Sequence, residues 1–330
     1  MRDTPTERLR RRAVSVSAVS VAAVSLTLTA PLWVAGGALV DLALARRRLP
    51  TVRLLAFGTA WCWLEVAGVS RAVGLWLIGR AADRDAHYAL QRWWITRLMG
   101  ALRRTTGIRV DATGAECLTP GPVVMVCRHV SLADSLLSAW VISDVARMNP
   151  HYVLKRELLS VPNLDVVGNR LPNCFIDRDA DDAQAELDRL RAAAGQLGPS
   201  DVMVIFPEGT RATPAKRARA VDKIAVVSPH RAEVVGRLRH LLPPRPGGTL
   251  AILAGQPEAD VVVAWHAGFD GMDSFGGIHR ALRRPPPPVR FRMERIARHQ
   301  LPADDQLEGW LDDLWVDTDQ RIDQLHSEAP

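Results

Sequence analysis

The chain of 330 residues is long enough for one large domain or two small ones, and its formal net charge is +6. Residues 1–53 carry nine arginines against three acidic residues, which accounts for the whole excess and leaves the rest of the chain neutral. The absence of net positive charge in residues 54–330 argues against nucleic-acid binding. A basic terminus beside an apolar segment is typical of contact with an anionic membrane surface.

The first long element is an apolar run over residues 13–45, in which Asp41 is the one charged residue. It exceeds the roughly 20 residues that a helix needs to cross a bilayer. The preceding arginines resemble the start of a signal peptide, but the run is longer than an apolar signal core of about 7–15 residues. We therefore expect an anchor that stays attached, with Pro31 as a candidate kink.

A second apolar segment over residues 54–78 contains Glu65 and Arg71. Each charge costs about 2.5–3.5 kcal/mol at the centre of a lipid-exposed span. Two alternatives follow: a second crossing that packs against the first, or a helix that lies partly in the interface. We favour a hairpin that returns the chain to the cytoplasm, so that residues 1–80 form a membrane anchor of one or two helices and residues 81–330 form the globular domain.

Residues 87–104 combine Trp93, Trp94 and several leucines with four arginines. This pattern fits a basic amphipathic helix in the lipid headgroup region, or equally an ordinary helix that faces a protein core. The paired tryptophans favour the membrane alternative.

After Gly107, short apolar runs alternate with amphipathic segments, which predicts an α/β sheet with helices on its faces. The expected strands are residues 108–111, 123–127, 152–155, 173–177, 202–206, 261–265 and 289–293. The expected helices are residues 132–145, 180–197, 232–241 and an acidic C-terminal helix at 305–326. Residues 212–248 form a long basic stretch, either a solvated face or a contact with phosphates.

His129 and Asp134 lie five residues apart where a predicted strand turns into a helix. A carboxylate in contact with an imidazole is the minimum needed to make a general base. The alternative is structural, because Ser131 followed by Asp134 is also a capping-box pattern.

A second block, residues 206–211 with the sequence FPEGTR, follows another predicted strand. Gly209 permits a close approach of the backbone to a ligand. Glu208, Thr210 and Arg211 bring an acceptor, a hydroxyl group and a cation to the same edge of the sheet.

The order of these blocks resembles the glycerolipid acyltransferase family, and most of all bacterial 1-acylglycerol-3-phosphate acyltransferases. Two intervening segments, residues 175–178 (FIDR) and 152–158 (YVLKREL), resemble further family motifs. The resemblance covers about residues 88–295. It departs from the family at Arg128, where many members have asparagine, and in the segment 261–266, which lacks the usual Val-Pro pair.

The resemblance implies a mixed central sheet flanked by helices, preceded by N-terminal membrane helices. It implies that His129 takes a proton from an acceptor hydroxyl as the hydroxyl attacks an acyl thioester, while Asp134 fixes the imidazole tautomer. Ser131 then caps the helix or donates a supporting hydrogen bond. The remaining implied substrate-binding residues are Lys155, Arg178, Glu208, Gly209, Thr210 and Arg211.

The expected reaction moves a fatty acyl group from acyl-CoA or acyl carrier protein, as a co-substrate, to lysophosphatidic acid, giving phosphatidic acid. Other acceptors are a different lysophospholipid, glycerol 3-phosphate or a glycolipid, and a thioesterase or lipid hydrolase is the more remote alternative. We expect no permanently bound cofactor and no metal. The expected location is the cell membrane, with the catalytic domain facing the cytoplasm.

Overall fold

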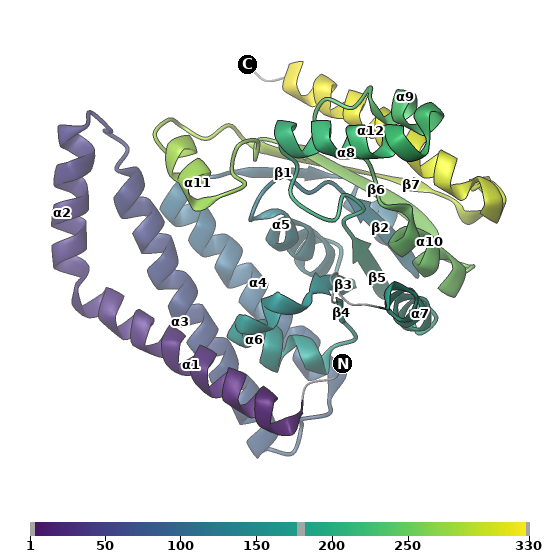
Figure 1. The fold of residues 1–330 in the computed structure, drawn as a ribbon. Coiled ribbons are helices and arrows are strands. Elements are labelled where there is room, and N and C mark those ends of the chain that lie inside the picture. The colour runs from purple at the N-terminus through teal and green to yellow at the C-terminus, as the bar shows by residue number, and fades with distance from the viewer. Residues whose placement is uncertain (1–3, 177–181, 328–330) are drawn as a thin grey trace. The chain divides into compact units, whose positions relative to one another are not determined.

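The computed structural model describes residues 4–176 and 182–327 (Figure 1). By internal contacts the chain divides into two compact units. The first comprises residues 4–108, 154–176 and 279–286, and the second comprises residues 109–153, 182–278 and 287–327. The predicted division at residue 80 stays a prediction. The two units are defined by internal contacts, and each combines segments that are distant in the sequence.

The first unit begins with four helices: α1 (Pro5–Leu28), α2 (Ala30–Ala43), α3 (Pro50–Leu77) and α4 (Arg84–Thr106). By length and composition, α1 and α3 could each cross a membrane. The expected single run over residues 13–45 is broken at Thr29. Pro31 explains the break, because proline has no N–H group to continue the helix and clashes with the carbonyl four residues earlier.

Glu65 and Arg71, the two charges of the predicted segment 54–78, are both engaged within the first unit. The Glu65 carboxylate accepts a 2.9 Å hydrogen bond from the backbone N–H of Asn163, in the short helix α6 (Pro162–Val166). The Arg71 guanidinium lies 3.5 Å from the centre of the Trp93 ring. Helix α3 also packs against α1, which fits the alternative of a second apolar helix packed on the first.

Helix α4 buries most of its apolar side. Leu90, Ile95, Leu98 and Met99 are each less than a tenth exposed. This burial fits the core-facing alternative for the predicted segment 87–104. Contact of α4 with a lipid interface stays a prediction.

The sheet is mixed, as predicted. Its strands are β1 (Val110–Thr113), β2 (Val123–Cys127), β3 (Asn149–Lys155), β4 (Cys174–Ile176), β5 (Asp201–Ile205), β6 (Asp260–Ala267) and β7 (Val289–Ile296). Their order is β1-β7-β6-β2-β5-β3-β4. Strand β6 pairs with β7 antiparallel, whereas β2 pairs with both β5 and β6 parallel.

Strand β2 is fully buried, which explains why it reads as the unbroken apolar run VVMVC. Because β5, β2 and β6 are parallel neighbours, their carboxyl ends lie at the same edge of the sheet. Ligands of open α/β sheets bind beyond this edge. The two predicted motifs follow β2 and β5, so the topology brings them together.

The helices of the second unit include α5 (Asp134–Trp140), α7 (Ala183–Ala194), α8 (Pro214–Val227), α9 (Pro229–Val235), α10 (Pro246–Gly255) and α12 (Leu307–Ser327). In Figure 1, α12 runs beside the sheet, where it packs on β6, and α10 packs on α7. Helix α11 (Phe275–Ala281) passes from the second unit into the first. Helices α8, α10 and α11 were not predicted.

The predicted helix at residues 232–241 is wrong at its carboxyl end, because α9 ends at Val235. The backbone N–H groups of Arg239, His240 and Leu241 instead donate to the carboxylate of Asp319 on α12. These tertiary bonds replace the bonds that a continued helix would form. The sequence around residue 240 carries no sign of a partner 80 residues away.

Candidate active site

The FPEGTR block holds the backbone of His129 on both sides. The N–H of His129 donates to Glu208 Oε1 at 2.6 Å, and the N–H of Ala212 donates to the carbonyl of His129 at 2.8 Å. The His129 ring lies against Phe206, with ring centres 4.7 Å apart. The second motif therefore fixes the position of the first, as their shared edge of the sheet predicts.

The His129 side chain is oriented by Asp134, at 3.0 Å from Nδ1 to Oδ2. We assign the proton on Nδ1, because a carboxylate accepts and cannot donate. The side chain is 23% exposed, and no described residue forms a hydrogen bond with Nε2. The predicted pair is present, and the nitrogen that faces away from Asp134 can accept a proton.

Asp134 is buried within a set of donors. Its carboxylate accepts hydrogen bonds from the backbone N–H groups of Val130 (2.6 Å) and Ser131 (2.7 Å) and from the Ser131 hydroxyl. His266 Nε2 lies 3.2 Å from the other carboxylate oxygen. Burial raises the pKa of Asp134, but the nearby His266 and His129 lower that pKa by more, so the carboxyl stays ionised.

The predicted capping role of Ser131 is wrong. Helix α5 begins at Asp134, and its N-cap residue is Ala133, whose side chain forms no capping bond. The Ser131 hydroxyl donates to Asp134 and accepts from the backbone N–H of Ala133 at 3.1 Å. Ser131 is thus a supporting donor, the second alternative that the sequence left open.

Glu208 links two loops through both of its carboxylate oxygens. Oε1 accepts from the N–H of His129, and Oε2 accepts from the N–H of Leu242 at 2.8 Å. The side chain is 1% exposed. Burial raises the pKa of Glu208 to about 8, while the bonds from Leu242 and His129 act in the opposite direction. A contact of Glu208 with substrate hydroxyls stays a prediction.

Replacing Glu208 with glutamine should destabilise the fold by about 1–3 kcal/mol, because the amide NH₂ must face a backbone N–H donor. It should also lower activity, since the backbone of His129 loses an anchor. Thermal unfolding and initial rates measure the two effects. The matched control is Glu258→Gln, at an exposed site of the same unit. Equal melting temperatures for the two variants would contradict this role of Glu208.

The rest of the FPEGTR block is a turn that includes the half-buried Arg211. Gly209 has φ +72°, a conformation that favours glycine, and its N–H donates to the Phe206 carbonyl at 3.0 Å. That bond occupies the backbone N–H of Gly209. Lys216 Nζ donates to Thr210 Oγ1 at 3.2 Å and to the Arg211 carbonyl at 3.1 Å. Lys216 therefore joins Arg211 at this turn.

The sequence predicted two further binding residues, Lys155 and Arg178. Lys155 ends strand β3, where it is exposed, and belongs to the first unit. Arg178 lies outside the described residues. The binding roles of Lys155, Arg178, Thr210 and Arg211 stay predictions.

Arg128 and His266 lie close to His129 and Asp134, and the sequence predicted no role in the site for either of them. The Arg128 side chain is 1% exposed; it donates to the His266 carbonyl and to Asp270 Oδ1, the latter at 2.6 Å. The His266 ring packs on Phe291, with ring centres 6.1 Å apart. The departure from the family at Arg128 thus concerns a buried contact beneath the site. One feature of the sequence could have indicated this proximity. Arg128 directly follows the apolar strand β2 and His266 lies at the end of the apolar strand β6, and the two strands are neighbours in the sheet.

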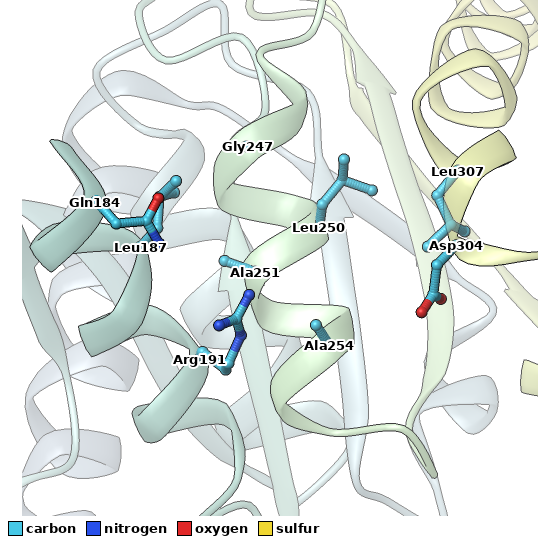
Figure 2. A pocket seen from close by; sticks show the side chains of 9 residues that line it. All are labelled: Gln184, Leu187, Arg191, Gly247, Leu250, Ala251, Ala254, Asp304 and Leu307. Atoms are coloured by element: carbon cyan, nitrogen blue, oxygen red, sulfur yellow. The ribbon is translucent and has the colours of Figure 1, made fainter.

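A separate pocket of about 270 Å³ opens between α7, α10 and the start of α12. Figure 2 shows Leu187, Leu250 and Leu307 around it, together with Arg191 and Asp304. None of the predicted site residues lines it. Its volume is below the roughly 300 Å³ at which ligand pockets begin.

Comparisons with known proteins indicate similarity to acyltransferases. The family model described as Acyltransferase matches residues 109–257. Lysophosphatidylinositol acyltransferase 10 of Caenorhabditis elegans is 24% identical over 277 residues, a match that spans 78% of this chain and 66% of that protein.

The fold is similar to the crystal structure of the 1-acyl-sn-glycerophosphate (LPA) acyltransferase PlsC from Thermotoga maritima. The TM-score is 0.56 at 15% identity, covering 85% of this chain and 99% of that one. The region matched by the family model, residues 109–257, contains the His129–Asp134 turn and the FPEGTR block. Together the three comparisons support a glycerolipid acyltransferase family for this chain.

Proposed function

We propose that the protein is a lipid O-acyltransferase in which His129 is the general base. The observation that carries the proposal is the 3.0 Å contact between His129 Nδ1 and Asp134, which leaves Nε2 to accept a proton. In the proposed step, Nε2 takes the proton of an acceptor hydroxyl while that oxygen attacks the thioester carbonyl. A C–O bond forms, the C–S bond breaks, and the thiolate leaves with the proton from the imidazolium.

Asp134 stabilises the imidazolium that forms during this step. Its ionised state is supported by the neighbouring histidines and by the donors that surround its carboxylate. The acceptor alcohol is itself the nucleophile. The mechanism therefore needs no acyl-enzyme intermediate.

The proposed donor is acyl-CoA or acyl carrier protein, and the proposed acceptor is lysophosphatidic acid. Arg211 and Lys216 at the catalytic turn suit a phosphate group, and a planar guanidinium can form two parallel bonds to phosphate. Lys155 and Arg178 are further candidates for this contact. A lysophosphatidylinositol acceptor is the second candidate, because the relative from Caenorhabditis elegans carries that name.

We propose that the protein is attached to the cell membrane with its catalytic domain facing the cytoplasm. Helices α1 and α3 are apolar enough to span a bilayer, and α1 begins with arginines that suit anionic headgroups. A lysophospholipid acceptor stays in the bilayer, whereas the acyl donor is soluble. Membrane attachment gives one site access to both.

An acceptor panel with one radiolabelled acyl-CoA tests the substrate. The purified protein should convert lysophosphatidic acid faster than lysophosphatidylinositol or lysophosphatidylcholine, because lysophosphatidic acid has a phosphate monoester for the two cations. It should also convert lysophosphatidic acid faster than glycerol 3-phosphate, which has no acyl chain to hold it in the bilayer. Thin-layer chromatography of the labelled lipids measures each rate. A preference for lysophosphatidylinositol would contradict the proposed acceptor but agree with the proposed acyl transfer. If no acceptor gave a labelled ester, both proposals would be contradicted.

A further inference from the structure

Three possible metal ligands meet on α12 and the loop after α9. His240, Asp323 and His326 each offer one ligand atom, and these atoms lie within 4.8 Å of one another. His240 Nε2 is 2.7 Å from Asp323 Oδ1, and the rings of His240 and His326 meet edge to face with centres 4.8 Å apart. All three side chains belong to the second unit and lie outside the set of contacts around His129.

The backbone beneath this cluster is firmly held. The carboxylate of Asp319, which is 3% exposed, accepts three 2.8 Å hydrogen bonds from the N–H groups of residues 239–241. Asp319 lies four residues before Asp323 and seven before His326, so all three share one face of α12. The loop that carries His240 is thereby fixed opposite Asp323 and His326. Such support is what a preorganised metal site needs.

The His326 ring has a second partner that suits a metal ligand. Its Nε2 is 3.1 Å from Asp270 Oδ2, and Arg128 holds the other oxygen of that carboxylate. A proton on Nε2 leaves the lone pair of Nδ1 free to bind a metal. A carboxylate that orients a ligating histidine in this way is common around zinc.

The donor set discriminates between metals. Two imidazole nitrogens and one carboxylate suit zinc, with a water or a further ligand in the fourth tetrahedral position. Magnesium and calcium prefer sites made of oxygen alone. The side chains of His240, Asp323 and His326 are 23%, 40% and 36% exposed, so an ion can reach them. Arg239 Nη1 lies 3.4 Å from Asp323 Oδ2, and its positive charge weakens the affinity.

We propose that His240, Asp323 and His326 form a zinc site that joins α12 to the loop after α9, with Asp270 orienting His326. The sequence predicted no metal site, because the ligands are separated by 83 residues and show none of the short zinc spacings. The bound ion would close a long loop and stabilise the second unit. This inference does not depend on the proposed transfer reaction.

The test is zinc binding by the full-length protein in detergent micelles after treatment with a chelator. Isothermal titration should give one zinc ion per chain, and zinc should raise the melting temperature, since an ion that binds only the folded state stabilises it. The variants His240→Gln and His326→Ala should bind at least tenfold more weakly. In the first variant, the glutamine amide can still form a hydrogen bond with Asp323, which preserves the fold.

The matched control is His230→Ala, which removes an exposed histidine on α9 and should leave zinc binding unchanged. Cobalt provides a second readout, because its absorption spectrum distinguishes tetrahedral from octahedral coordination. No stoichiometric zinc binding by the wild type would overturn the proposal. Equal affinity in His240→Gln and in the wild type would do the same.

Discussion

The variant His129→Ala is expected to lower kcat by at least about 10²–10⁴-fold, because a positioned general base contributes this much to a proton-transfer step. The melting temperature should change little, since the side chain is partly exposed and the backbone bonds to Glu208 and Ala212 do not depend on the imidazole. Initial rates with lysophosphatidic acid and acyl-CoA measure the loss.

His230→Ala serves as the matched control, because it removes an exposed histidine of the same unit. This control should keep the wild-type rate. Both variants should partition into the membrane fraction as the wild type does, which separates loss of chemistry from loss of attachment. Purified His129→Ala with a rate within tenfold of the wild type would contradict the assignment of the base.

The variant Asp134→Asn is expected to lower kcat by about 10⁴-fold, the effect seen when the carboxylate of a catalytic triad becomes an amide and the histidine takes the wrong tautomer. It should also destabilise the fold by about 1–3 kcal/mol, because the amide NH₂ faces the N–H donors of Val130 and Ser131. Rates and thermal unfolding measure the two effects.

The pH dependence of this stability follows from the pKa of Asp134, which is lower in the folded protein than its usual value of 3.8. A carboxyl with a depressed folded pKa stabilises the fold above its unfolded pKa and loses that contribution as the pH falls through the folded value. The difference in free energy of unfolding between the wild type and Asp134→Asn should therefore be constant between about pH 5 and 8. It should shrink in acid, where the wild type is protonated as well.

The comparison variant for Asp134→Asn is Ser131→Ala, which removes one donor to the same carboxylate and keeps the bond to His129. It should lose much less activity than Asp134→Asn. A rate loss as large in Ser131→Ala would show that the network of donors matters more than the orientation of His129. That result would contradict the assigned role of Asp134.

The central strands and the two sequence motifs, the His129–Asp134 turn and the FPEGTR block, could be predicted, because their signals are local. Strand β2 is buried on both faces and must therefore be apolar throughout. The blocks follow parallel neighbours in the sheet, so the topology alone brings His129 and the FPEGTR turn to the same edge.

Two of the missed features depend on contacts between distant parts of the chain. The loop at His240 is formed by Asp319, and the side chain of Arg128 is buried by Asp270 and β6. Ser131 matched a capping box, yet Asp134 turns its carboxylate back to the preceding N–H groups and starts the helix itself. At His240 and Arg128 the partner carboxylate lies far away along the chain and cannot be read from the adjacent residues. At Ser131 the partner is adjacent, and the local pattern allowed two different hydrogen-bond arrangements.

The most direct test of a base that acts on a lipid hydroxyl is the ratio of thiol released to ester formed. Purified protein should release one thiol for each diacyl product with lysophosphatidic acid present, and almost none without it. The His129→Ala variant should lose both products together. Thiol release that continues at the same rate without an acceptor would show that water is the nucleophile, and it would contradict acyl transfer as the reaction.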